Sequence, residues 1–220
     1  MSALLLGHRG DPDNHVENSL AGFAAAMACG ADGVELDVQV SVDGEPFVIH
    51  DATLDRTVPG GSGRVDARNA EELHALGVPH LRDALHLLRD HVTAVELKPP
   101  FDAAPGLSLV ALDLAAPGQR ILLLAFDARH LAAARGHHPQ ARTALLTTER
   151  PGDARAALAA AGATMLAAQW QAIDAALCRE VPVIAWTVDD EQDARRLLDM
   201  GVQELISNRP CALRDVVRRA

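Results

Sequence analysis

Short apolar runs alternate with alanine- and leucine-rich stretches along nearly the whole chain, with no long polar or low-complexity linker between them. Each run has the length of a β-strand, and the stretches between runs have helical spacing or composition. This alternation is typical of parallel strands that are covered by helices. The strand candidates are residues 3–7, 33–40 (continuing through a turn into 46–50), 93–98, 120–126, 142–147, 164–169, 181–188 and 203–207.

These eight strand–helix units predict an α/β fold of the compact (β/α)8 TIM-barrel type, because 220 residues lie at the small end of its range. A doubly wound open sheet is the alternative. We expect residues 1–220 to form one barrel domain. Residues 51–80 contain a stretch without a clear period, and we interpret them as an excursion from the second βα loop, on the catalytic face of a barrel.

Glycines and short polar residues mark the expected helix ends. Asn18 is a candidate cap for the first helix, and Gly30 ends that helix. Either Asp189 or Asp190 caps a helix over residues 190–200, where Asp189 is more consistent with a capping role than with catalysis.

Charge and composition exclude several classes of partner. The chain has 20 Lys+Arg against 30 Asp+Glu, a formal net charge of −10, so nucleic acid is not an expected partner. Aromatic residues make up 3%, with no tyrosine, which leaves little for a base-stacking platform. No segment has about 18 uninterrupted apolar residues, so we expect no stable membrane association. The oligomeric state is not predicted.

The three cysteines, Cys29, Cys178 and Cys211, are far apart in sequence and form no C-x-x-C motif. This pattern predicts reduced cysteines in a cytoplasmic protein.

Three acidic residues lie near strand ends. Glu35 and Asp37 are two residues apart on one strand, so their side chains point to the same face. Two carboxylates held together repel each other unless a proton or cation lies between them. Glu96, on the next strand, supplies a third oxygen ligand. An all-carboxylate set predicts Mg²⁺ or Ca²⁺ rather than Zn²⁺, whereas an exposed edge with solvated acids is the alternative.

Two histidines, His8 and His50, each end a strand-like run. They suit general acid–base chemistry on either side of a scissile P–O bond, although a histidine at a strand end is also a common structural residue. Arg9 and Lys98, the latter being the single lysine in the sequence, suit phosphate oxygens. The sequence does not decide which histidine is the acid and which the base.

Phe126 and Trp186 also end strand candidates and suit an apolar wall for a small organic group, or alternatively the core. We expect Asp51, Asp55 and Arg56 to order the excursion.

The order of these motifs resembles that of the glycerophosphodiester phosphodiesterase family, from residue 7 to residue 210. The resemblance rests on His8-Arg9-Gly10, Glu17-Asn18-Ser19, Glu35-Leu36-Asp37, His50-Asp51, Leu54-Asp55-Arg56-Thr57, Glu96-Leu97-Lys98 and Trp186-Thr187-Val188.

This resemblance implies a (β/α)8 barrel that hydrolyses glycerophosphodiesters, such as glycerophosphocholine, to glycerol 3-phosphate and an alcohol. By the same resemblance, each candidate residue receives a role. The divalent-metal ligands are Glu35, Asp37 and Glu96, the acid–base pair is His8 and His50, the phosphate contacts are Arg9 and Lys98, the pocket lining is Phe126 and Trp186, and the supporting residue is Glu17.

The chain departs from the family pattern in four places. Val16 replaces a usual proline, Ala125 replaces a small polar residue, and a late Thr-Asp-x-Pro element reads Ser-Asn-Arg-Pro over residues 207–210. The insertion after Arg64 is shortened. Because that insertion helps to shape the cleft in the family, the substrate is less well predicted than the reaction.

Two other functions compete with this prediction. A lysophospholipase D-like or other phosphodiester hydrolase would keep the chemistry and change the substrate. A catalytically silent barrel that binds a phosphorylated metabolite would keep only the fold.

Overall fold

The computed structural model describes residues 3–219, and within them eight parallel strands form a closed barrel. Closure is seen at β1, which pairs with both β2 and β9, so the open-sheet alternative is wrong and the predicted barrel is confirmed. Its strands are β1 (Leu4–His8), β2 (Gly33–Val40), β4 (Val92–Leu97), β5 (Arg120–Ala125), β6 (Arg142–Thr147), β7 (Met165–Gln169), β8 (Val183–Trp186) and β9 (Glu204–Ser207).

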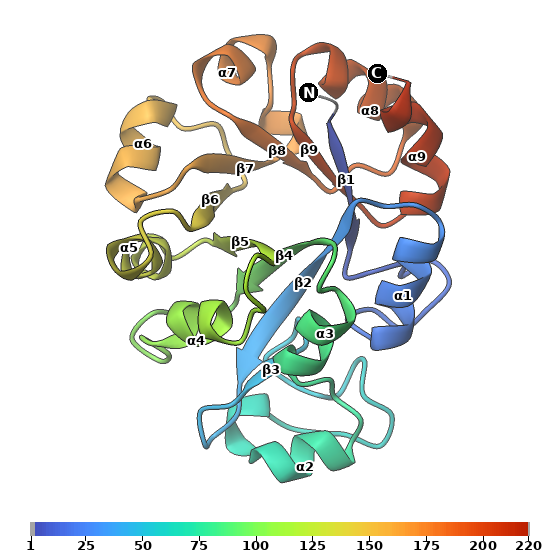
Figure 1. The fold of residues 1–220 in the computed structure, drawn as a ribbon, viewed down its shortest axis with the longest axis vertical. Helices are drawn as coiled ribbons and strands as arrows, with labels where there is room; N and C mark the ends of the chain where they lie inside the picture. Colours follow the sequence, from blue (N-terminus) through green and yellow to red (C-terminus); the bar gives the residue numbers. More distant parts are fainter. Residues whose placement is uncertain (1–2, 220) are drawn as a thin grey trace.

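Helices surround the strands as an outer ring, except for α2, which lies beyond it at the bottom of the view (Figure 1). They are α1 (Leu20–Ala28), α2 (Ala70–Ala75), α3 (Leu81–Leu87), α4 (Leu107–Asp113), α5 (Ala128–His137), α6 (Ala154–Ala161), α7 (Ala175–Glu180), α8 (Glu191–Asp199) and α9 (Pro210–Arg218), with short 3-10 turns at Val65–Ala67 and Trp170–Ala172. Among residues 3–219, none of these helices has the length and apolar character that crossing a membrane requires.

Apolar side chains fill two layers, one inside the barrel and one between the strands and the helices. Leu6, Leu122 and Ile184 belong to the inner layer, where strand residues pack against one another. At the amino-terminal ends of the strands, Glu204 of β9 is only 3% exposed and forms an ion pair with Arg142 of β6. The inner layer therefore contains a buried charge on the side away from the strand carboxyl ends.

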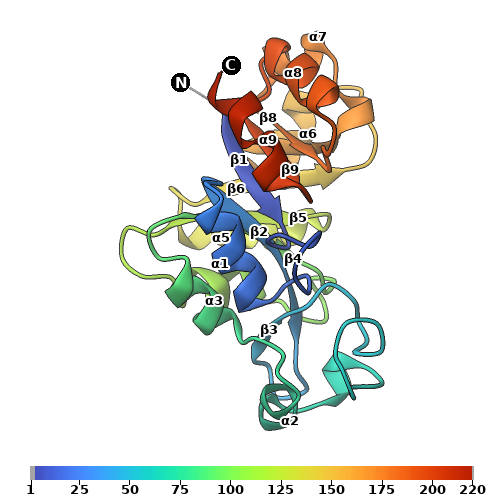
Figure 2. The ribbon, with the colours of Figure 1, turned by 90° about the vertical axis from the view of Figure 1, so that its right-hand side faces the viewer.

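The excursion between β2 and β4 begins with β3 (Pro46–Val48), which runs antiparallel to β2. The chain then folds over a small core of its own, which includes Phe47, Leu54, Val65 and Leu73. An isolated antiparallel β-bridge pairs His80, just before α3, with Phe47 of β3, and the chain then continues into α3 and β4. This segment, with α2, lies at one end of the long axis of the molecule (Figure 2).

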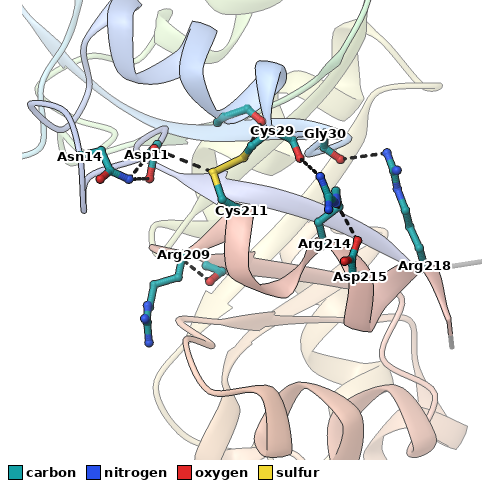
Figure 3. The surroundings of a disulfide bond; sticks show 11 residues. Asp11, Asn14, Cys29, Gly30, Arg209, Cys211, Arg214, Asp215 and Arg218 are labelled. Atoms are coloured by element: carbon teal, nitrogen blue, oxygen red, sulfur yellow. Dashed lines mark hydrogen bonds and ion pairs between the residues drawn. A yellow bond between two sulfur atoms is a disulfide. The ribbon is translucent and has the colours of Figure 1, made fainter.

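A disulfide joins Cys29, after α1, to Cys211 in the first turn of α9 (Figure 3). The prediction that all three cysteines are reduced is therefore wrong for this pair, whereas Cys178 is free. The physical reason is barrel closure. Because β1 and β9 are neighbours, the helices that follow them pack side by side, and residues 182 apart in sequence have Cα atoms 5.2 Å apart.

One expected cap differs in the structure, and the choice left open for another is decided. Ser19, not Asn18, caps α1, because its Oγ accepts a hydrogen bond from the Gly22 amide at 3.0 Å. Asp190, rather than Asp189, caps α8 by accepting two backbone amides. Both displaced residues, Asn18 and Asp189, instead bond to groups at the strand carboxyl ends.

Candidate active site

Strand register brings the predicted polar residues together at the carboxyl end of the barrel. His8 on β1 lies opposite Glu35 on β2, and Asp37 on β2 lies opposite Glu96 on β4. Parallel strands in register present these side chains at one rim. There a cleft of about 230 Å³ opens among them.

The three carboxylates Glu35, Asp37 and Glu96 each offer an oxygen, and these oxygens lie within 4.8 Å of one another. Burial raises the pKa of Glu35 well above its ordinary value, and the negative charges of Asp37 and Glu96 raise it further. Burial and the Asp37 charge also raise the pKa of Glu96. The fully ionised form of such a cluster is unfavourable unless positive charge offsets the repulsion, and Lys98 pairs with both Asp37 and Glu96.

Asp37 is completely buried and is held from several sides. Its Oδ2 accepts a hydrogen bond from Asn18 Nδ2 at 2.7 Å and lies 3.1 Å from Arg9 Nε. Its Oδ1 lies 3.5 Å from Lys98 Nζ but accepts no hydrogen bond. A buried carboxylate oxygen left without a hydrogen bond, facing two further carboxylates, fits a hard oxygen-seeking cation such as Mg²⁺ or Ca²⁺.

His8 ends β1 with its ring between the cleft and a neighbouring loop. Its Nδ1 lies 2.7 Å from Asn208 Oδ1, and its Nε2 lies 3.8 Å from Glu35 Oε2. Burial lowers the pKa of His8, and the positive charge of Arg9 lowers it further. The lowered pKa favours the uncharged imidazole, which can accept a proton.

His50 follows β3 and is fixed by a different network. Its Nδ1 lies 2.7 Å from Asp51 Oδ1, and Arg56 Nε donates to Asp51 Oδ2 at 2.6 Å. Arg56 also donates two hydrogen bonds to Glu17, which accepts another from Arg9. The hydrogen bonds from Arg56 lower the pKa of Glu17 to about 2 and hold that of Asp51 well below its usual range. Ion pairs and hydrogen bonds thus connect Arg56 of the excursion, through Asp51 and Glu17, to His50 and Arg9.

The side of the cleft formed by β5, β6 and β8 is apolar. Phe126 is 51% exposed, and its ring meets that of Trp186 edge-on, with centroids 6.1 Å apart. Trp186 Nε1 donates to the carbonyl of Ala167 at 2.9 Å, which orients the indole. Leu124 and Leu146 complete this wall. The rim is therefore divided into a charged side and an apolar side.

The cleft is lined by eight of the predicted site residues. They are His8, Arg9, Glu35, His50, Glu96, Lys98, Phe126 and Trp186. The other two lie close by, since Asp37 is buried beside Glu96 and Glu17 pairs with Arg9.

Sequence reasoning missed the placement of three polar residues, Asn18, Asp189 and Asn208. The first two are interpreted as caps, and the third lies in a late motif to which no role is given. A usable signal is position, because Asp189 and Asn208 directly follow strand candidates, as His8 and His50 end theirs.

Comparisons with known proteins cover nearly the whole chain. Residues 8–212 match the model of the glycerophosphoryl diester phosphodiesterase family. A curated relative from Caldanaerobacter subterraneus, named glycerophosphodiester phosphodiesterase, is 30% identical over 244 aligned residues, covering 100% of this chain and 99% of the relative.

Solved structures show the same fold. A phosphodiesterase from Oleispira antarctica, in complex with the product sn-glycerol-3-phosphate, superposes with a TM-score of 0.88 at 22% identity, covering 99% of this chain and 97% of that one. A glycerophosphodiester phosphodiesterase from Thermotoga maritima gives a TM-score of 0.82 at 22% identity, covering 98% and 99%.

Proposed function

The chain belongs to the glycerophosphoryl diester phosphodiesterase family and is a phosphoric diester hydrolase, and from that premise we propose that it hydrolyses glycerophosphodiesters to glycerol 3-phosphate and an alcohol. The observation that carries the proposal is the pairing of two imidazoles, His8 and His50, with the Glu35–Asp37–Glu96 cluster around one cleft. A phosphodiester bound in that cleft contacts both imidazoles.

In the proposed reaction an oxygen nucleophile bonds to phosphorus as the ester P–O bond breaks. The nucleophile is water or a neighbouring hydroxyl of the substrate; in the latter case water opens the resulting cyclic diester. His8 takes the proton from the nucleophile through Nε2, and His50 gives a proton to the departing alkoxide. The lowered pKa of His8 supports its role as the base.

The charged residues of the cleft bind and orient the phosphoryl group. Arg9 offers a planar guanidinium and Lys98 a point charge. A divalent cation held by Glu35, Asp37 and Glu96 would neutralise charge on the phosphoryl oxygens. Ion pairs with Asp37 and Glu96 raise the pKa of Lys98 despite its burial, so the ammonium stays charged.

The first experiment measures glycerol 3-phosphate released from glycerophosphocholine by the purified protein, with Mg²⁺ or Ca²⁺ and again with EDTA. We expect release with metal and loss of release with EDTA. His50→Ala lowers kcat by roughly 10²–10⁴-fold, because the departing oxygen loses its proton donor. Exposed His86 supplies the matched control, since His86→Ala removes an imidazole that does not line the cleft.

Either of two results contradicts the proposal. Full activity of a folded His50→Ala protein would show that His50 is not the general acid. Equal activity with EDTA and with added metal would show that the reaction does not need the proposed cation.

One observation favours lysophospholipids as a second substrate class. A mainly apolar hollow of about 240 Å³ lies against the excursion, and His50 lines both this hollow and the cleft. Val16, on its rim, is 57% exposed. If an acyl chain occupies the hollow, Val16→Asp lowers kcat/KM for lysophosphatidylcholine and leaves that for glycerophosphocholine unchanged. If Val16→Asp changes kcat/KM equally for both substrates, an acyl chain does not occupy this hollow.

A further inference from the structure

Two residues outside the predicted site, Asp189 and Asn208, connect the ends of β8 and β9 to His8. Asp189 Oδ1 accepts hydrogen bonds from the Asn208 backbone amide at 2.7 Å and from Ser207 Oγ at 3.0 Å. Asp189 Oδ2 accepts from Asn208 Nδ2 at 2.8 Å. The carboxamide oxygen of Asn208 then lies 2.7 Å from His8 Nδ1.

This chain of contacts allows only one arrangement of hydrogens. The Asp189 carboxylate can only accept, so the NH₂ group of Asn208 has to face it. The Asn208 amide oxygen therefore faces His8. Like the carboxylate, an amide oxygen can only accept a hydrogen bond. His8 Nδ1 consequently carries the hydrogen, which leaves Nε2 with a free lone pair towards the cleft.

We propose that Asp189 and Asn208 are positioning residues that hold His8 in its Nδ1–H tautomer, so that Nε2 is the atom available for proton transfer. The inference rests on the proposed role of His8. Neither residue lines the cleft itself, and both act through the His8 imidazole. The anchoring of Asp189 by three donors explains how one amide orientation is kept.

The decisive variant is Asp189→Asn, which keeps the shape of residue 189 and turns one acceptor into a donor. The new NH₂ group opposes the NH₂ of Asn208, so the Asn208 amide rotates and presents NH₂ to His8 Nδ1. The ring must then accept at Nδ1 and carry its hydrogen on Nε2. We expect ¹⁵N NMR of the full chain to show the switched His8 tautomer, and kcat to fall roughly 10²–10⁴-fold with little change in KM.

A complementary exchange tests the same logic in reverse. In the Asp189→Asn/Asn208→Asp double variant, residue 189 donates to the new carboxylate, and that carboxylate accepts from His8 Nδ1. We expect the Nδ1–H tautomer and most of the lost kcat to return. Ser207→Ala is the matched control, because it removes a donor to the same Asp189 oxygen without changing the pattern at Asn208.

His8→Ala separates this inference from the proposed function and identifies the His8 NMR signals. Full activity of His8→Ala overturns the role of His8 itself. If His8→Ala is inactive while Asp189→Asn keeps the original tautomer and kcat, only the positioning inference fails. Should Asp189→Asn not fold, Asn208→Leu decides: a mixed tautomer with lowered kcat supports the inference, and an unchanged tautomer overturns it.

Discussion

Replacing Cys211 with serine removes the covalent link between α1 and α9, and we expect this to lower the free energy of unfolding. The cross-link restricts the unfolded chain, because it keeps closed a loop whose ends are 182 residues apart. Without it, the unfolded ensemble gains conformational freedom and unfolding becomes easier. The folded state keeps other contacts at this seam, such as the hydrogen bond from Arg214 to the Cys29 carbonyl.

The magnitude follows from the loop length. For a separation of 182 residues, the chain-entropy relation gives an upper limit of about 5 kcal/mol at 25 °C. Residual structure in the unfolded chain reduces that figure, so we expect a loss of about 2–5 kcal/mol. For a chain of 220 residues this corresponds to a fall in Tm of roughly 5–10 °C.

Equilibrium unfolding in urea, with and without reductant, measures the loss. Cys29→Ser, Cys211→Ser and the double variant should lose the same stability, because each breaks the same bond. Cys178→Ser is the matched control, since Cys178 is free. The reasoning is refuted if reductant leaves the wild-type midpoint unchanged, or if thiol titration in denaturant finds three thiols instead of one.

Three further predictions concern buried and networked charges. Because hydrogen bonds from Arg56 hold the pKa of Glu17 at about 2 against an ordinary 4.5, the stability it contributes is present above pH 4.5 and is lost as pH falls towards 2. The urea midpoints of wild type and Glu17→Gln should therefore converge over that range. Arg142→Met leaves Glu204 buried without its partner and should cost about 3–5 kcal/mol in urea unfolding. Glu35→Gln relieves repulsion in the carboxylate cluster, so without metal it should stabilise the fold by about 1–2 kcal/mol while abolishing activity.

Controls for these variants come from the same chain. Arg150→Met breaks the exposed pair with Asp174 and should cost less than about 1 kcal/mol. An equal cost for Arg142→Met would show that burial of Glu204 does not matter. A constant difference between the urea midpoints of wild type and Glu17→Gln at all pH values would contradict the Glu17 prediction. A Tm of Glu35→Gln below that of wild type, both measured without metal, would contradict the Glu35 prediction.

Local pattern was sufficient to predict the barrel and much of the site. The apolar runs coincide with the barrel strands to within a few residues, and residues 142–147 match β6 at both ends. The site follows from the same pattern, because polar residues at the carboxyl ends of such runs have one rim in common. Strand register then places His8 by Glu35 and Asp37 by Glu96.

The remaining features depend on contacts between distant segments. Asn18 resembles a cap because short polar residues favour helix starts, yet its backbone has φ of 56° and its amide bonds to Asp37. Asp189 and Asp190 are equally plausible caps for the same helix in the sequence. Only the position of β9 shows that the Asp189 carboxylate binds the backbone amide of Asn208 instead. The Cys29–Cys211 pair depends on closure of the ring, which no local spacing reveals.

The division of the rim into a charged side and an apolar side has an evolutionary consequence. The carboxylates and both histidines come from β1, β2, β4 and the segment after β3. Phe126 directly follows β5, and Leu146 and Trp186 lie on β6 and β8. Under the proposed function, mutations in the second group would alter the fit of the organic group without moving the residues assigned to phosphate. A lineage with this barrel could then drift among organic substituents by small steps while it keeps the proposed hydrolytic chemistry.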